Sequence, residues 1–174
     1  MPKTRTVDLF AGCGGMTLGF QNAGFKIVSA FDYWAPAVDI YNKNFKHPIF
    51  KIDLGEKNAY KKIESFKPEL IIGGPPCQDF SEAGHRDESL GRANLTISFA
   101  DIVAKLKPNY FVMENVPLVK KSDMYSKALN KFKKVGYGLT AVTLDASRCG
   151  VPQKRKRLFL IGGIDFDHDQ LESD

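Results

Sequence analysis

Short apolar runs alternate with longer amphipathic segments along the whole chain. Runs rich in apolar and β-branched residues predict strands, and these runs are 6–10, 26–32, 49–54, 70–74, 110–116, 139–144 and 157–163. The segments between them have helical spacing, at about 15–23, 35–45, 56–66, 92–106 and 124–135. Gly24, Pro68 and Pro108 stand where helices end. Strands alternating with helices predict an α/β fold with a mostly parallel, Rossmann-like sheet and helices on both faces.

Residues of unusual chemistry follow five of these predicted strands. The first run ends in FAGCGG and the fourth in GGPPC. The second ends at Asp32, the third at Asp53, and the fifth at Glu114. Open α/β sheets bind ligands at the carboxyl ends of their strands. We therefore expect a single site at that edge, although any one of these residues could instead be a turn or a helix cap.

Composition places the chain among ordinary globular domains. It has 174 residues, 43% hydrophobic and 26% charged, which suits a single domain over residues 1–174. The net charge of +5 permits a polyanionic partner without establishing one. No apolar run is long enough to span a bilayer, and MPKTRTVDLF lacks the apolar stretch of a signal peptide. We therefore expect an intracellular protein.

The cysteines and histidines form no recognisable framework. They are scattered singly, so neither a set of disulfides nor a metal site is expected. They are Cys13, Cys77, Cys149, His47, His85 and His168.

The segment DLFAGCGGMTLGF has the strand, glycine turn and helix of a nucleotide-type site. Asp32 follows Gly12 by about 20 residues, where a carboxylate can accept both hydroxyls of a ribose. The dinucleotide fingerprint needs a third glycine, and the chain has Thr17 there. This spacing favours S-adenosylmethionine, which has a ribose but no pyrophosphate, and leaves NAD open.

Cys77 stands in GGPPCQDF, a turn too rich in proline for an interior strand. Its thiolate would be a nucleophile if its pKa were lowered, whereas most isolated cysteines are small core residues. The apolar residues before Glu114 predict partial burial, which would raise its pKa and suit it to carrying a proton. Arg155 and Arg157 stand at alternate positions entering the last run and would share one face, as oxygen-binding groups or as solvated surface.

Taken in order, DLFAGCGG, GGPPCQDFS, MENV and QKRKR resemble the DNA (cytosine-5)-methyltransferase family over nearly the whole chain. The resemblance implies the class I fold of S-adenosylmethionine-dependent methyltransferases and a double-stranded DNA substrate with a flipped-out cytosine. It implies that Cys77 attacks C6 and that Glu114 contacts N3 and the exocyclic amine. It also implies that Arg157 holds the cytosine O2 and that Arg155 supports the same loop and base.

The resemblance also implies an S-adenosylmethionine pocket at the strand ends. Phe10 would stack near the adenine, Asp32 would hold the ribose, and Asp53 would face the adenine amine. Asp32 departs from the glutamate that the family more often has, and it is one methylene shorter. The residues expected to bind the cofactor are Phe10, Ala11, Gly12, Cys13, Gly15, Asp32, Tyr33, Asp53, Leu54, Pro76 and Leu95.

Part of the family pattern is not found in this sequence. Family members continue with a target-recognition region and return with a segment that completes the catalytic domain, whereas this chain ends soon after RLFLIGG. We expect a truncated form, one subunit of a split enzyme whose second polypeptide supplies the rest, or a fragment of a longer chain. Activity in isolation would then be weak or absent. The polar segment 79–92 is expected to be either a loop that closes over the base or a plain exposed connection.

Other functions stay open on the sequence alone. The chain could be a non-catalytic S-adenosylmethionine-binding scaffold, although a scaffold has no need of Cys77. It could also methylate cytosine C5 in RNA. An exocyclic-amine methyltransferase needs no thiol, and a nicotinamide oxidoreductase would require the absent third glycine. The expected location is cytoplasmic, at the nucleoid when bound to DNA, with no membrane partner.

Overall fold

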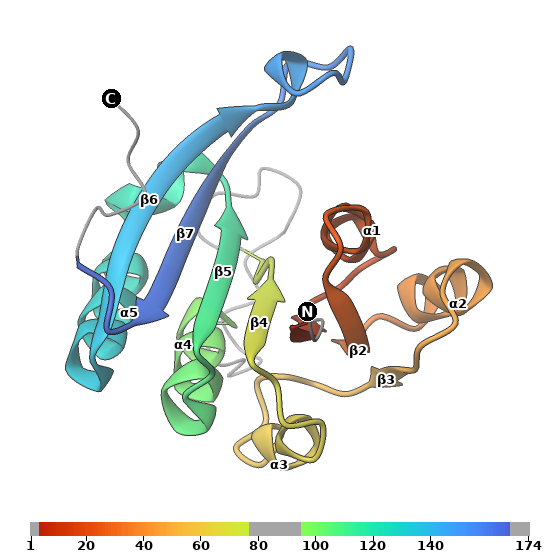
Figure 1. The fold of residues 1–174 in the computed structure, drawn as a ribbon, viewed down its shortest axis with the longest axis horizontal. Coiled ribbons are helices and arrows are strands. Elements are labelled where there is room, and N and C mark those ends of the chain that lie inside the picture. Colours follow the sequence, from red (N-terminus) through yellow and green to blue (C-terminus); the bar gives the residue numbers. More distant parts are fainter. Residues whose placement is uncertain (1–3, 77–94, 168–174) are drawn as a thin grey trace, which may run out of the picture.

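The computed structural model describes residues 4–76 and 95–167. Its centre is a seven-stranded sheet of order β3-β2-β1-β4-β5-β7-β6 (Figure 1). The strands are β1 (Arg5–Leu9), β2 (Lys26–Asp32), β3 (Ile49–Lys51), β4 (Leu70–Gly73), β5 (Tyr110–Asn115), β6 (Tyr137–Asp145) and β7 (Lys156–Ile164).

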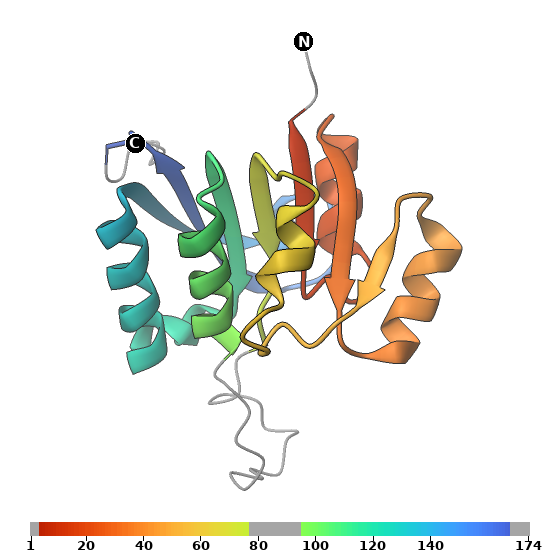
Figure 2. The ribbon, with the colours of Figure 1, turned by 90° about the horizontal axis from the view of Figure 1, so that it is seen from below.

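Five α-helices and two short 3-10 helices connect the described strands. They are α1 (Gly15–Asn22), α2 (Ala35–Asn44), α3 (Tyr60–Glu64), α4 (Leu95–Leu106), α5 (Asp123–Val135), η3 (Pro117–Lys121) and η4 (Ala146–Arg148). Helices α3, α4 and α5 lie along one face of the sheet, and α1 lies behind it (Figure 2). The predicted α/β architecture is therefore confirmed.

Strands β1 to β5 are parallel to one another, as helix crossovers require. Strand β7 is inserted between β5 and β6 and is antiparallel to both. An antiparallel pair needs no long crossover, and only the short 3-10 helix η4 lies between β6 and β7 along the described chain. The sheet is thus mostly parallel, as predicted, with a long antiparallel hairpin at one edge.

The main core fills the space between the sheet and α3, α4 and α5. Val7 and Leu9 of β1 are fully buried there, and so is Phe111 of β5, whose ring lies 4.2 Å from that of Phe132 on α5. Alternation along β5 and β7 sends every second side chain into this core. Burial of aromatic and aliphatic side chains at this interface is the main stabilising contribution to the fold.

The opposite face of β5 and β7 is less well covered. Val112, Phe159 and Ile161 alternate with the core residues and are only half-buried. A groove of about 570 Å³ lies between this face and α1, whose Met16 and Phe20 form its apolar wall. Within the described residues, helices therefore cover this face of the sheet less completely than the sequence predicted.

Helix α3 is shorter than the sequence predicted. The pattern indicated 56–66, whereas the helix covers only Tyr60–Glu64. Asp53 accepts a hydrogen bond from the backbone N–H of Gly55 at 2.8 Å, and Ala59 N–H donates to the Glu56 carbonyl. These turn contacts hold 53–59 as a loop, because an aspartate favours local side-chain bonds over a helical start.

Candidate cofactor and cytosine site

The glycine turn after β1 has an unusual backbone. Phe10 follows the strand with a φ of 56°, a left-handed conformation that is uncommon for a non-glycine residue. Gly14 caps α1 with a φ of 93°, and a β-carbon there would lie 2.2 Å from the Phe45 ring. Only glycine fits that position. At Gly12, by contrast, a β-carbon would meet nothing within 4 Å, so the turn presents an open surface.

Asp32 is fixed beside this turn. One carboxylate oxygen accepts the backbone N–H of Gly12, and the other accepts the N–H of Trp34, both at 2.8 Å. A carboxylate oxygen can accept more than one hydrogen bond, so both retain acceptor capacity. The structure therefore presents an oriented acceptor pair next to an open glycine turn, which fits the two hydroxyls of a ribose.

Asp53 lies near Asp32 because the pairing of β2 with β3 extends by one hydrogen bond beyond the end of β3. The N–H of Ile52 donates to the Asp32 carbonyl at 3.0 Å, which places Asp53 directly after this contact. Leu54 is only 3% exposed and belongs to the main core, so it has little surface left for a ligand. Asp53 is therefore better placed than Leu54 to contact the adenine end of S-adenosylmethionine.

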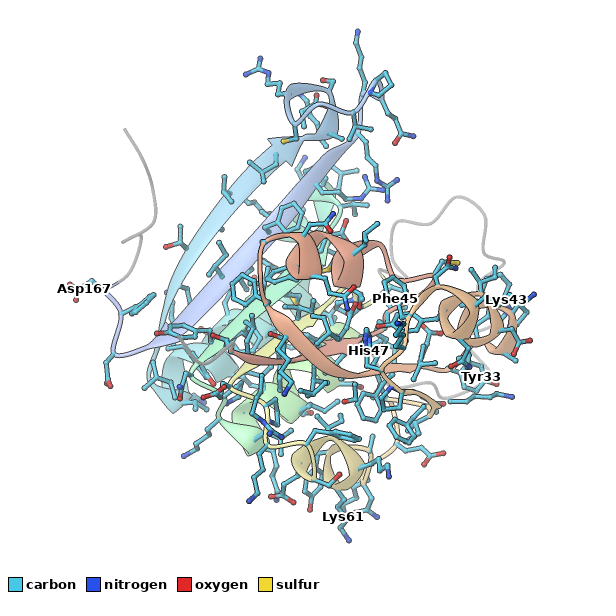
Figure 3. The ribbon with its side chains drawn as sticks, turned by 45° about the vertical axis from the view of Figure 1, so that its right-hand side comes forward. Tyr33, Lys43, Phe45, His47, Lys61 and Asp167 are labelled. Carbon is cyan, nitrogen blue, oxygen red and sulfur yellow. The ribbon has the colours of Figure 1, made fainter. Side chains whose placement is uncertain are left out.

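The remaining predicted cofactor residues differ in exposure. Tyr33 is 60% exposed and points outward from the start of the α2 connection (Figure 3). Cys13 is also exposed, whereas Ala11 is buried. Leu95 is the first residue of α4, and Pro76 is exposed at the end of the described β4 turn.

The β4 turn is joined to β5 by a buried side chain. The amide Nδ2 of Asn115 donates to the carbonyl of Pro75 at 3.0 Å. Its Oδ1 accepts the N–H of Val116, so both ends of the amide are used. A β-carbon on Gly74 would lie 3.1 Å from Glu114 Oε2, so this glycine leaves room for the carboxylate. The turn that leads to Cys77 is thereby held against Glu114.

Glu114 forms an ion pair with the next strand. Arg157 Nε lies 2.9 Å from Glu114 Oε1, and both side chains are about one-quarter exposed, at 24% and 23%. Burial raises the pKa of Glu114, while the charges of Arg157 and Arg155 and the hydrogen bond from Arg157 oppose that rise. The predicted upward shift in the pKa of Glu114 is confirmed in direction.

Arg155 lies close enough to act on the same carboxyl. It precedes β7, and its backbone N–H donates to Asp145 at 3.2 Å. Glu114, Arg155 and Arg157 all line the groove beside α1. The structure thus brings together three of the four residues predicted to be catalytic. Cys77 and the segment 79–92 lie outside the described residues.

Comparison with known proteins decides the family. A sequence model of the family described as C-5 cytosine-specific DNA methylase matches residues 4–170. This chain belongs to that family. Type II methyltransferase M.HindV of Haemophilus influenzae is 56% identical over 168 residues, covering 96% of this chain and 55% of that protein. Type II methyltransferase M.HgiDI of Herpetosiphon aurantiacus is 56% identical over 159 residues, covering 91% and 52%.

A solved structure agrees with the fold. The crystal structure of a candidate DNA modification methyltransferase encoded within an E. coli prophage superimposes with a TM-score of 0.80 and 32% identity. The match covers 93% of this chain and 47% of that chain. This chain therefore has the class I fold of S-adenosylmethionine-dependent methyltransferases, and it spans about half the length of the two relatives named above.

The described residues hold neither a membrane-spanning helix nor a cluster of potential metal ligands. None of the described helices combines the length and apolar character needed to cross a membrane. Within residues 4–76 and 95–167, no group of three or more potential ligands could hold a metal ion.

Sequence reasoning missed two features of the site. One is the buried amide of Asn115, whose place beside Glu114 in the MENV motif gives no sign of its bond to the Pro75 carbonyl. The other is Asp8, a carboxyl that is 1% exposed in the middle of β1. An acidic residue inside the apolar run TVDLF was the available signal, because such a residue is rarely buried without a partner.

Proposed function

We propose that this chain is the catalytic portion of a DNA cytosine-5 methyltransferase that takes its methyl group from S-adenosylmethionine. The observation that carries the proposal is the Glu114–Arg157 pair at the wall of one groove, beside the β4 turn that leads to Cys77. A carboxyl of raised pKa and a guanidinium match a pyrimidine edge, which offers a ring nitrogen and a carbonyl oxygen.

In the proposed mechanism, the Cys77 thiolate forms a bond to C6 of the cytosine. Glu114 contacts N3 and the exocyclic amine, so it can stabilise the protonated ring, while Arg157 holds O2. C5 then carries the electron density needed to accept a methyl group. The bound cofactor supplies that methyl group in electrophilic form. A water molecule would take the C5 proton, the Cys77–C6 bond would break, and the N3 proton would return to Glu114, which restores the aromatic ring and the free thiolate.

Asp32 would hold the ribose of the cofactor through its two oriented oxygens. The open turn at Gly12 would allow close approach of the ligand to the backbone. Phe10, Tyr33 and Asp53 would flank the adenine, with Asp53 accepting from its amine. Ala11, Cys13, Gly15, Leu54, Pro76 and Leu95 complete the proposed cofactor set.

Double-stranded DNA is the proposed substrate, with the target base flipped out of the stack. The net charge of +5 is compatible with a polyanion. The relatives M.HindV and M.HgiDI are Type II methyltransferases, which supports a role in restriction–modification and, with it, a cytoplasmic location beside DNA.

We further propose that another polypeptide segment covers the groove beside α1. Phe159, which lines this groove, is only partly buried, and Leu144 in the same lining is 43% exposed. An uncovered apolar surface of this kind marks a contact region. The segment would be either a continuation of the same chain or a second polypeptide, and it would also bring target recognition.

The test is methyl transfer from labelled S-adenosylmethionine to mixed-sequence duplex DNA, with matched RNA as a second substrate. This chain is assayed alone and with the product of the adjoining reading frame, each with a Cys77→Ser control. Activity on DNA that needs the partner and disappears in the control supports a split cytosine-5 enzyme. Preference for the RNA substrate would replace the DNA assignment.

Cofactor binding is measured separately through the single tryptophan of the chain. Trp34 donates its backbone N–H to Asp32, so its fluorescence should change when a ligand engages that carboxylate. Binding without methyl transfer in any combination would sink the catalytic assignment and leave a cofactor-binding scaffold. An Asp32→Ala variant that binds equally well would overturn the proposed ribose contact.

A further inference from the structure

A buried carboxyl lies behind the glycine turn. Asp8 is 1% exposed on β1, and its side chain faces α1 rather than the main core. Oδ2 accepts a hydrogen bond from Thr17 Oγ1 at 2.7 Å. Oδ1 is buried and has no hydrogen-bond partner in the structure. The proposed methyl transfer makes no use of this residue.

Hydrogen bonds lead from Asp8 to the surface of the protein. Thr17 Oγ1 on α1 lies 2.8 Å from the hydroxyl of Tyr41 on α2, and both residues are fully buried. The Tyr41 hydroxyl lies 2.6 Å from Nε2 of His47, which is half-buried in the connection before β3. Four residues from four segments therefore form one continuous chain of hydrogen bonds.

The number of protons fixes the direction of every bond in this chain. When Asp8 is ionised it can only accept, so Thr17 must donate its single hydroxyl proton to it. Thr17 must then accept from Tyr41, because it has no second proton. Tyr41 must in turn accept from His47. Ionised Asp8 therefore requires a hydrogen on Nε2 of His47.

Protonation of Asp8 allows the opposite direction. A proton on Oδ2 can be donated to Thr17 Oγ1, which then donates to Tyr41. Tyr41 donates to His47, whose Nε2 must be free of hydrogen, as in the Nδ1–H tautomer. One proton at Asp8 thus decides which nitrogen of a distant imidazole carries hydrogen, without any change in the charge of His47.

The titration falls near neutral pH. Burial raises the pKa of Asp8 to about 7, the negative charge of Asp32 adds to this rise, and hydrogen bonding from Thr17 opposes it. The unpartnered Oδ1 agrees with this, since it is better tolerated as a carbonyl oxygen than as part of a carboxylate. Burial lowers the pKa of His47, which favours its neutral ring. Burial also raises the pKa of Tyr41, so it stays protonated.

The chain also contacts the glycine turn. The Tyr41 ring lies 4.5 Å from the Phe45 ring, measured between centroids, and the Phe45 ring covers the position above Gly14. His47 lies beside Phe45, with ring centroids 5.6 Å apart (Figure 3). The groups that bear on Asp8 are therefore Thr17 from α1, Tyr41 from α2 and the charge of Asp32 from β2, with His47 and its exposed neighbour Lys46 at the far end.

We propose that Asp8, Thr17, Tyr41 and His47 form a proton-coupled relay that reverses as a unit and sets the charge behind the glycine turn. Asp8 is a positioning residue, since it acts through Thr17, Tyr41 and Asp32. The relay itself stands independently of the proposed function. Its coupling to the cofactor rests on that function, because a cationic ligand at the turn stabilises ionised Asp8.

The test is nitrogen-15 NMR of the His47 ring between pH 6.5 and 8.5, over the part of that range in which the spectra show a neutral ring. The wild-type protein should change from the Nδ1–H to the Nε2–H tautomer near pH 7 while the ring remains neutral. Tyr41→Phe should abolish this change, because the relay is then interrupted. Tyr137→Phe is the matched control, since it removes another buried tyrosine hydroxyl, which donates to the Pro108 carbonyl at 2.6 Å.

An unchanged tautomer across this range, or the same change in Tyr41→Phe, would overturn the relay. Asp8→Asn is a second variant, and it should hold His47 in one tautomer at every pH. Saturating S-adenosylmethionine should lower the midpoint of the wild-type transition by about half a pH unit, and S-adenosylhomocysteine, which lacks the positive sulfur, should lower it less. Equal midpoints with both bound ligands would remove the coupling but keep the relay, whereas failure of both to bind would reject the coupling together with the proposed function.

Discussion

Asp8 and Glu114 occupy comparable places in the two halves of the sheet, one on β1 and the other on β5. Burial raises the pKa of both carboxyls. Glu114 is balanced by two arginines and remains about one-quarter exposed at the groove. Asp8 is sealed, and its hydrogen-bond partner is a hydroxyl. The comparison shows that burial alone does not define the role of a carboxyl, because its partners decide which protonation state is stabilised and what can reach it.

The largest expected effect comes from the carboxyl at the groove. Glu114→Gln keeps the shape of the side chain but removes its ability to exchange a proton. We expect methyl transfer by the active assembly to fall by about 10²- to 10⁴-fold, as for loss of a general acid–base group. Cofactor binding, followed by Trp34 fluorescence, should be unchanged. Activity within a few-fold of wild type would show that Glu114 is not a proton carrier.

The sealed carboxyl should affect stability rather than rate, with a defined pH dependence. Burial raises the pKa of Asp8 to about 7 in the folded chain, from an ordinary value of 3.8. Its contribution to stability is therefore complete below pH 4 and is lost as the pH rises through 7. Asp8→Asn cannot ionise, so the stability of the variant relative to wild type should rise by about 3 kcal/mol between pH 5 and pH 8.

Urea unfolding at these two pH values measures this difference. Asp123→Asn, a change at an exposed residue in the first turn of α5, serves as the control and should give a nearly constant difference. A pH-independent offset for Asp8→Asn would mean that Asp8 is not protonated in the folded chain.

A smaller effect is expected at Asn115, whose side chain joins the β4 turn to β5. Asn115→Ala removes the donor to the Pro75 carbonyl and leaves that buried oxygen without its partner. We expect a loss of about 1–3 kcal/mol in the free energy of unfolding, and lower methyl transfer with unchanged cofactor affinity. Asn130→Ala changes an exposed asparagine on α5 and should cost little by comparison. Equal losses in the free energy of unfolding of the two variants would contradict a structural role for the Asn115–Pro75 bond.

The smallest stability effect concerns the ion pair itself. Arg157→Met removes the guanidinium but keeps much of the apolar stem, so the free energy of unfolding should change by no more than about 1 kcal/mol. The pKa of Glu114 should rise further, because its strongest opposing charge is lost. Carbon-13 NMR of the Glu114 carboxyl measures this shift. Arg148→Met, at an exposed residue of η4, is the matched control and should leave that pKa in place.

Much of the fold was predictable because its elements have clear periodicity. Strands β1, β2 and β5 were placed to within a residue or two, since their apolar runs end at glycine, proline or charged residues. The extent of α3 was wrong, because the local turn at Asp53 competes with the helix. The insertion of β7 between β5 and β6 could not be read from periodicity, which does not identify the strand that pairs with another.

The sequence by itself determined the family, the order of strands and helices along the chain, and the nature of the groups at the carboxyl edge, because these depend on residue type and local spacing. Tertiary structure alone decided the Glu114–Arg157 pair, the Asn115–Pro75 bond and the chain from Asp8 to His47. Each joins residues on separate elements, and its energy depends on distances and burial that only packing sets. The same physical reason applies to Asp8, whose charge becomes costly only after the sheet and α1 close around it.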